Sequence, residues 1–276
     1  MKYIDIHSHL NLKPLNENIE EVIFCMQEQG VATITVGVDY ATSKMAIELA
    51  EKYPEMLWAT VGLHPNDATA SFAPSENEWA EFKKLAQNSK VVAIGECGLD
   101  YFRIDQPSSV PAELLRAKQK EIFKKQIELA IEISKPLMIH ARPSKGSMDA
   151  YEDTLELLEN YKSQKTNNKP HANFHFFVGN IEIAKRILDI GGTMSFDGPI
   201  TFSEEYDEVI KFLPIESIMC ETDAPFAAPT PFRGRMCEPW MVVEVVKKIA
   251  EIKGLPVETV EKAMLENAKR VFGVHV

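Results

Sequence analysis

The chain alternates short apolar runs with helix-like segments, and this alternation constrains its fold more than any other feature. After the first run, Ile19, Val22 and Met26 recur at the spacing of one helix face. The strand-like runs occupy residues 3–6, 31–38, 57–62, 91–95, 137–139, 172–174, 193–196 and 217–220. Such alternation favours a parallel sheet with helical crossovers. Eight units in about 250 residues is the size of a single (β/α)₈ barrel, and an open doubly wound sheet is the alternative.

Polar side chains at the ends of the runs decide between these two folds. His7 and His9 follow the first run two residues apart, so both imidazoles point the same way in an extended segment. The other candidates stand at the ends of four later runs: Glu96, His140, His175 and Asp223. Only a closed barrel brings five strand ends around one point. We therefore expect one α/β domain over residues 1–276, a (β/α)₈ TIM barrel with a metal site at the C-terminal ends of its strands.

These six side chains together have the composition of a two-metal centre. Four imidazoles and two carboxylates are too many for one tetrahedral site that keeps an open position. They suit two divalent ions about 3.5–4 Å apart, bridged by a carboxylate and a hydroxide, which activate water and bind ester oxygens. Mixed imidazole and carboxylate ligands accept Mg, Mn, Zn or Fe, so the sequence leaves the metal open. We predict a metal-dependent hydrolase.

Each candidate also has a structural interpretation when it is considered alone. His140 follows an apolar run as a core histidine would, and Asp223 is placed to cap a turn. Glu96 has Arg103 nearby in sequence as an ion-pair partner. Structural polar residues have no reason to gather on one rim of a barrel, so the joint placement favours the metal site. His64 ends the third run, where a substrate contact and a structural role both remain open.

Composition restricts the partners and the compartment. The net charge of −11 argues against a broad basic surface for nucleic acid, although a metal centre and a few arginines can hold phosphates on an acidic protein. The sequence has no apolar stretch of about 18 residues, so we expect no membrane span. It shows no basic-then-apolar leader at its start. The cysteines form no Cys-x-x-Cys pair, and we expect free thiols in a reducing compartment, first the cytoplasm.

Motifs along the chain resemble, in their order, those of the TatD family of metal-dependent deoxyribonucleases, within the amidohydrolase-like barrels. The matching segments are Asp5–Leu10, Gly62–Pro65, Gly95–Tyr101, Pro136–Arg142, Glu221–Pro225, Arg233–Arg235 with Glu238–Pro239, Glu266–Ala268 and Phe272. They cover nearly the whole chain. The resemblance implies a (β/α)₈ barrel with two metal ions that hydrolyses phosphodiester bonds, typically as a 3′-5′ exonuclease on DNA.

The resemblance also implies a role for each matching residue. It pairs the metal ligands as His7 with His9 and His140 with His175. Glu96 would bridge the two ions. Asp223 would bind metal and take the proton from the attacking water, a role that suits a carboxylate whose basicity is tuned by neighbouring ions.

The resemblance implies DNA, as single strands or 3′ ends, as the substrate. Candidates for contact with it are His64, Arg142, Lys145, Arg233 and Arg235. The basic residues lie near the expected rim or on the last loop, where phosphate contacts and solvated surface charge are the two alternatives.

Two departures from the family's usual motifs leave the substrate open. Residues 175–179 read His-Phe-Phe-Val-Gly where the family usually has His-Cys-Phe-Ser-Gly, so apolar groups replace a thiol and a hydroxyl. Cys237 stands where the family usually has Asn. The loops at 104–111 and 163–170 are further places where the mouth of the barrel could differ. The alternatives are a hydrolase of another ester or amide, such as a lactone or a small phosphoester, and a non-catalytic binding protein.

Overall fold

A nearly closed circle of parallel strands forms the centre of the molecule. A computed structural model describes residues 1–67, 74–104, 110–163 and 171–275. Its eight-stranded sheet has the order β1 (Tyr3–Ser8), β2 (Val31–Thr35), β3 (Leu57–Val61), β4 (Val91–Asp100), β5 (Leu137–Arg142), β6 (Ala172–Phe174), β7 (Thr193–Phe196) and β8 (Ile218–Cys220). A parallel bridge between Ser8 and Ala224 joins the segment after β8 to β1. The predicted TIM barrel is confirmed, and the open doubly wound sheet is wrong.

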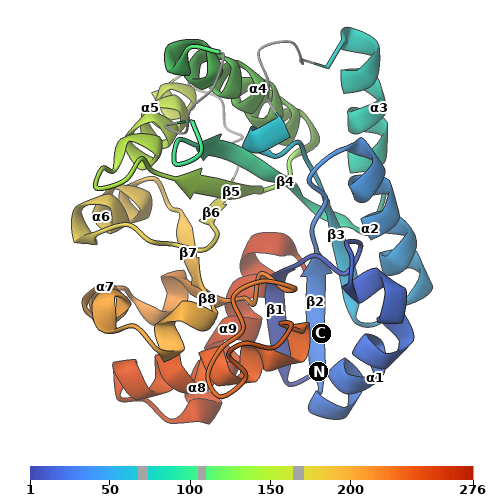
Figure 1. Cartoon of the computed structure of the whole chain (residues 1–276), viewed down its shortest axis with the longest axis vertical. Helices are drawn as coiled ribbons and strands as arrows, with labels where there is room; N and C mark the ends of the chain where they lie inside the picture. Colours follow the sequence, from blue (N-terminus) through green and yellow to red (C-terminus); the bar gives the residue numbers. More distant parts are fainter. Residues whose placement is uncertain (68–73, 105–109, 164–170, 276) are drawn as a thin grey trace.

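Helices surround the strands, as Figure 1 shows. They are α1 (Ile19–Gln29), α2 (Tyr40–Lys52), α3 (Glu76–Ala86), α4 (Ala112–Ile133), α5 (Asp149–Ser163), α6 (Ile181–Asp189), α7 (Asp207–Phe212), α8 (Val242–Lys253) and α9 (Val257–Phe272). The sequence patterns gave no sign of the short α7. Within the described ranges, none of these helices combines the length and the apolar character needed to cross a membrane.

Local sequence signals explain how the chain passes from helix to strand. Gly30 ends α1 in the left-handed conformation, with φ of 66°, which glycine adopts without a steric penalty. The strand β2 begins at the next residue, and all its side chains are buried, as in a parallel sheet covered on both faces. Asp39 then caps α2, because its carboxylate accepts a 2.7 Å hydrogen bond from the backbone N–H of Thr42.

The strand β4 is longer than the predicted run of 91–95 and therefore carries Glu96 within the strand rather than after it. Its pairing with β5 shifts in register just beyond Ile94. Gly98 has a φ of 135° and lies so close to β5 that a Cβ there would collide with the carbonyl oxygen of His140. Only glycine permits this approach, and it keeps β4 paired with β5 beyond the point where the apolar pattern stops.

Two further expectations concern cysteines and loops. All four cysteines are free, as predicted; Cys97, Cys220 and Cys237 are buried and Cys25 is half-buried. The loops at 104–111 and 163–170, which were expected to reshape the mouth of the barrel, lie largely outside the described residues.

Candidate metal centre

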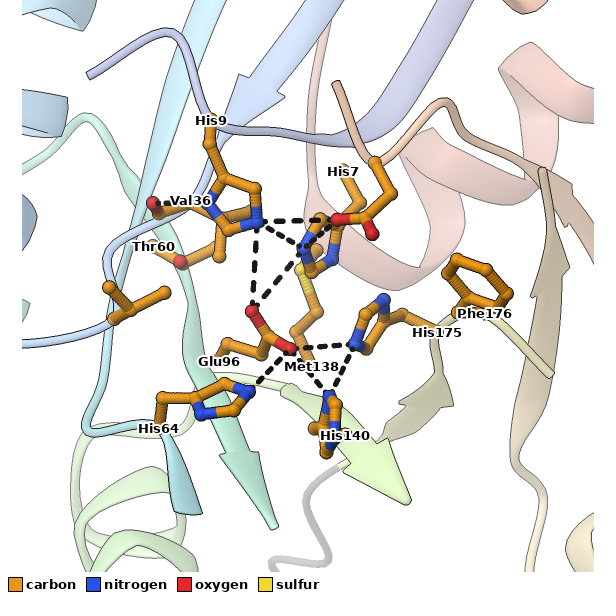
Figure 2. A network of polar contacts seen from close by, with 12 residues as sticks. His7, His9, Val36, Thr60, His64, Glu96, Met138, His140, His175 and Phe176 are labelled. Atoms are coloured by element: carbon orange, nitrogen blue, oxygen red, sulfur yellow. Dashed lines mark hydrogen bonds and ion pairs between the residues drawn. The ribbon is translucent and has the colours of Figure 1, made fainter. Parts of the chain in front are cut away.

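All six side chains that the sequence singled out come together at the C-terminal end of the barrel, and Figure 2 labels all of them except Asp223. They are His7 in β1, His9 just after it, Glu96 in β4, His140 in β5, His175 directly after β6, and Asp223 just after β8. Five of them line one cavity of about 620 Å³: His9, Glu96, His140, His175 and Asp223. The strand-end rule therefore predicted this convergence correctly.

Glu96 is the centre of the cluster, and its two carboxylate oxygens face different imidazoles. Its Oε1 lies 2.8 Å from Nδ1 of His140 and 2.8 Å from Nε2 of His175. Its Oε2 lies 3.5 Å from Nε2 of His7 and 3.8 Å from Nε2 of His9. One carboxylate thus connects two pairs of nitrogen donors, which is the arrangement that a bridging ligand between two ions requires.

Asp223 completes the side of the centre formed by His7 and His9. Its Oδ1 lies 3.3 Å from Nε2 of His9 and 3.6 Å from Nε2 of His7. The donor atoms of these three residues all lie within 4.8 Å of one another, as a shared ion requires. Asp5 holds this side in place, because it accepts hydrogen bonds from the backbone N–H of His7 and from both donors of Thr222.

The facing imidazole nitrogens also fit a bound cation. Nε2 of His7 and Nε2 of His9 lie 3.2 Å apart, and Nδ1 of His140 and Nε2 of His175 also lie 3.2 Å apart. Without an ion, one proton must lie between each pair of nitrogen lone pairs. A divalent ion would accept both lone pairs at once, so the donor set matches the nitrogen and oxygen ligands of Zn, Mn or Fe.

The cluster keeps its carboxylates ionised. Burial alone would raise the pKa of Glu96, but the imidazoles of His175, His64 and His140 lower it well below its usual range. Burial would likewise raise the pKa of Asp223, and the imidazoles of His9 and His7 lower it instead. Ionised carboxylates among imidazoles provide the anionic ligands that a divalent cation needs.

His64, whose role the sequence left open, faces the centre. Its Nε2 lies 3.3 Å from Oε1 of Glu96. Its Nδ1 accepts a 3.1 Å hydrogen bond from the backbone N–H of Asn66. A neutral His64 therefore carries its proton on Nε2 and points a donor into the centre. This arrangement favours a hydrogen bond to substrate over metal ligation.

Two carboxylates near the centre escaped the sequence reasoning. Asp100 lies with its Oδ2 3.3 Å from Nε2 of His140. Glu221 lies with its Oε1 3.5 Å from Nδ1 of His175 and accepts a 2.6 Å hydrogen bond from the hydroxyl of Ser195 through Oε2. The sequence does contain a signal for each of them. Asp100 stands four positions after Glu96, on the same face of the strand. Glu221 is an acidic residue directly after β8.

The basic substrate-contact candidates differ in position. Arg142 lines the cavity, and its guanidinium carbon lies 4.1 Å from the ring centroid of Phe102. Arg233 is exposed and stacks over Phe202 at 3.7 Å, and Arg235 is also exposed. Neither is among the described residues that line the cavity, nor is the exposed Lys145. Their phosphate contacts stay predictions.

Comparisons with known proteins agree with this geometry. A sequence profile of the family described as TatD related DNase matches residues 4–273. The chain is 36% identical to the uncharacterized metal-dependent hydrolase YabD of Bacillus subtilis (strain 168), over 98% of this chain and 99% of that protein. The crystal structure of YjjV, a TatD homologue from Escherichia coli K12, has a TM-score of 0.84 and 25% identity, with 99% of each chain covered. A TatD family hydrolase from Entamoeba histolytica has the same fold, with a TM-score of 0.82, 22% identity, and 98% of this chain and 97% of that chain covered.

Proposed function

This chain belongs to the TatD-related DNase family and is a metal-dependent hydrolase, and we propose that it hydrolyses phosphodiester bonds in DNA. We propose further that it removes nucleotides from single strands or 3′ ends. The family match extends over residues 4–273, which supports one hydrolase domain for the whole of 1–276. The relatives named as hydrolases argue against a non-catalytic binding protein.

The observation that carries this proposal is the position of the Glu96 carboxylate between two imidazole pairs. His7 and His9, with Asp223, would hold one divalent ion, and His140 and His175 would hold the other. Glu96 would bridge them through its two oxygens. Bound divalent ions lower the pKa of water and offset the negative charge of a phosphodiester. Mg, Mn, Zn and Fe remain the candidate metals.

The protein groups around the centre have complementary tasks in this proposal. Asp223 directs Oδ1 toward His7 and His9, and Oδ2 is the oxygen that we assign as acceptor of the proton from the attacking water. His64 donates from Nε2 to a phosphate oxygen beside Glu96. Arg142, held against the ring of Phe102, binds a second phosphate at the edge of the cavity.

A hydrolase of another ester or amide is the second candidate function. The apolar side chains of Phe176 and Val178 line the cavity where the family usually has a thiol and a hydroxyl. A lactone or small phosphoester needs fewer polar contacts than a DNA backbone, and the same metal pair would hydrolyse it. We place either activity in the cytoplasm, because the four free thiols suit a reducing compartment.

Digestion of labelled DNA tests the proposal. Metal-stripped protein would receive 5′-labelled single-stranded DNA with Mg²⁺, Mn²⁺ or Zn²⁺, beside Glu96→Gln and the exposed control Glu258→Gln on α9. We expect metal-dependent shortening from the 3′ end by the wild type and the control, and none by Glu96→Gln. Intact DNA with every metal, together with hydrolysis of a lactone or small phosphoester, would move the substrate to the second candidate.

A further inference from the structure

The cavity above the metal centre is lined by two chemically different arcs. The ends of β4 and β5 and the loops after β3 and β4 contribute mostly polar and charged side chains: Asn66, Asp67, Asp100, Arg103 and Arg142. The loops after β6, β8 and β1 contribute apolar ones: Phe176, Val178, Phe226 and Leu12. We call these the polar arc and the apolar arc. Because the strands follow one another around the barrel, the arcs lie on different sides of Glu96.

Phe176 belongs to the apolar arc through an unusual backbone conformation. Its φ of 46° is left-handed, which costs a bulky residue energy and is found mainly where the surroundings enforce it. Its backbone N–H donates a 2.6 Å hydrogen bond to Oε1 of Glu221, which holds this conformation. The ring stands edge-on to His175, with centroids 6.5 Å apart, and Figure 2 shows it beyond His175 on the side away from His64.

Phe226 is the second aromatic ring of the apolar arc. It remains 55% exposed although it borders the centre. Its backbone N–H donates a 2.9 Å hydrogen bond to the carbonyl oxygen of Asp223, which fixes the turn that carries it. Its ring centroid lies 6.2 Å from that of His9. Two aromatic rings thus each contact an imidazole of the centre from the same arc.

The polar arc supplies the opposite chemistry. Arg142 and Arg103 both line it, and the guanidinium of Arg142 is stacked on Phe102. Stacking pre-orients the planar guanidinium while its N–H groups stay available at the ring's edge. A ligand that spans the centre would therefore meet two arginines among polar and acidic side chains on one side of Glu96 and an aromatic surface on the other.

We propose that the apolar arc stacks the base of the terminal nucleotide, while Arg142 and Arg103 bind the phosphate that flanks the bond to be cut. This inference rests on the proposed function and adds how the substrate lies in the cavity. Aromatic rings stack with any base because every base has a π-face, so the enzyme takes nucleic-acid ends with an intact terminal base and shows little sequence preference. Phe176 and Phe226 are then the residues that determine this specificity.

The test compares two single-stranded oligonucleotides that differ only at the 3′-terminal residue. One ends in an ordinary nucleotide, and the other ends in an abasic tetrahydrofuran nucleotide. We expect the wild type to release the ordinary terminus about tenfold faster in kcat/KM, within the range of stacking on one aromatic group. Phe226→Ala and Phe176→Gly should bring this ratio close to one. Gly tolerates positive φ at position 176, and Phe226 is exposed, so neither change opens a cavity in the core.

Phe24→Ala on α1 is the matched control, because Phe24 is 60% exposed and lies away from the cavity lining. It should keep the wild-type ratio. Equal release of both termini by the wild type, or full preference retained by both cavity variants, would overturn this inference and leave the proposed function standing. Failure to release either terminus would overturn the proposed function together with this inference.

Discussion

The two sides of the candidate centre have different supports. On the side formed by His140 and His175, each imidazole has a carboxylate behind it. Nε2 of His140 lies 3.3 Å from Asp100, and Nδ1 of His175 lies 3.5 Å from Glu221. These carboxylates come from the end of β4 and from the residue directly after β8, so two further strand ends support this side.

The side formed by His7 and His9 has a neutral support. Nδ1 of His9 lies 3.3 Å from the carbonyl oxygen of Val36. Nδ1 of His7 has no hydrogen-bond partner within the part of the chain that the structure describes, and neither has Nδ1 of His175, but Nδ1 of His175 does have a carboxylate, that of Glu221, at 3.5 Å. On this side the negative charge comes instead from Asp223, whose Oδ1 lies near the Nε2 atoms of His7 and His9, where an ion would bind.

We infer from this difference that one side mainly holds its metal ion and that the other side mainly carries out the proton transfer. A carboxylate behind an imidazole fixes the ring and raises its basicity, which strengthens metal binding. We therefore expect the His140–His175 side to bind its ion more tightly. The His7–His9 side, with Asp223 in front, is expected to bind its ion less tightly and to carry the proton transfer.

Among the substitutions that test this comparison, Asp223→Asn should lower the activity most. The amide cannot accept a proton, so kcat on labelled single-stranded DNA should fall by about 10²- to 10⁴-fold. The control Asp207→Asn, at the start of α7, removes a carboxylate that is not among the described residues lining the cavity and should keep its activity. A loss of less than about tenfold for Asp223→Asn would remove this residue from the role of proton acceptor.

Asp100→Asn should weaken one side only. We expect the affinity for the ion held by His140 and His175 to fall by about 10- to 100-fold, because a neutral amide replaces the carboxylate behind His140. Titration with a chelator should resolve two release steps, of which only the tighter moves. Glu221→Gln should act in the same direction through His175. An equal shift of both steps would show that the two sides are not supported separately.

Arg142→Ala should act on substrate binding rather than on the metals. Loss of a hydrogen bond from a charged donor corresponds to about a tenfold rise in KM or more. The salt dependence of DNA binding should also become less steep. Arg235→Ala, which removes an exposed arginine that does not line the described cavity, should change KM by less than about twofold. Similar KM changes in both variants would place the DNA across the whole rim.

The unfolding free energy of the metal-free protein should depend on pH in a way that shows whether Asp100 is ionised in the folded state. Burial would raise the pKa of Asp100, but hydrogen bonds from His140 and its neighbours lower it from 3.8 to about 2. A lowered folded-state pKa stabilises the fold above the unfolded value and loses this contribution as pH falls through the folded value. Urea titrations should therefore show the difference in unfolding free energy between wild type and Asp100→Asn shrinking by about 1–2 kcal/mol as pH falls from about 5 to about 2. A constant difference over this range would contradict the lowered pKa.

The sequence predicted the barrel and the six converging side chains because both follow from one regularity. Parallel strands end on the same face, so His140 after one apolar run and Asp223 after another must meet once the sheet closes. This regularity holds without knowledge of any side-chain conformation. It needs only the approximate ends of the strands.

The carboxylates behind the imidazoles could not be predicted from the ends of the strands alone. The apolar pattern of β4 stops before Glu96, so Asp100 looked like a loop residue, whereas close backbone approach at Gly98 keeps the strand going. The direction of a side chain on an irregular loop has no periodicity, so the sequence did not separate Arg142, which lines the cavity, from Arg233, which stacks over Phe202.

The most direct test of the central claim is the metal content of the Mn²⁺-loaded protein, measured together with its electron paramagnetic resonance spectrum. We predict two Mn²⁺ ions per chain with an exchange-coupled spectrum, because the Glu96 carboxylate would connect them. Glu96→Gln should lose this coupling. A single ion per chain, or two ions with independent spectra in the wild type, would contradict a bridged two-metal centre.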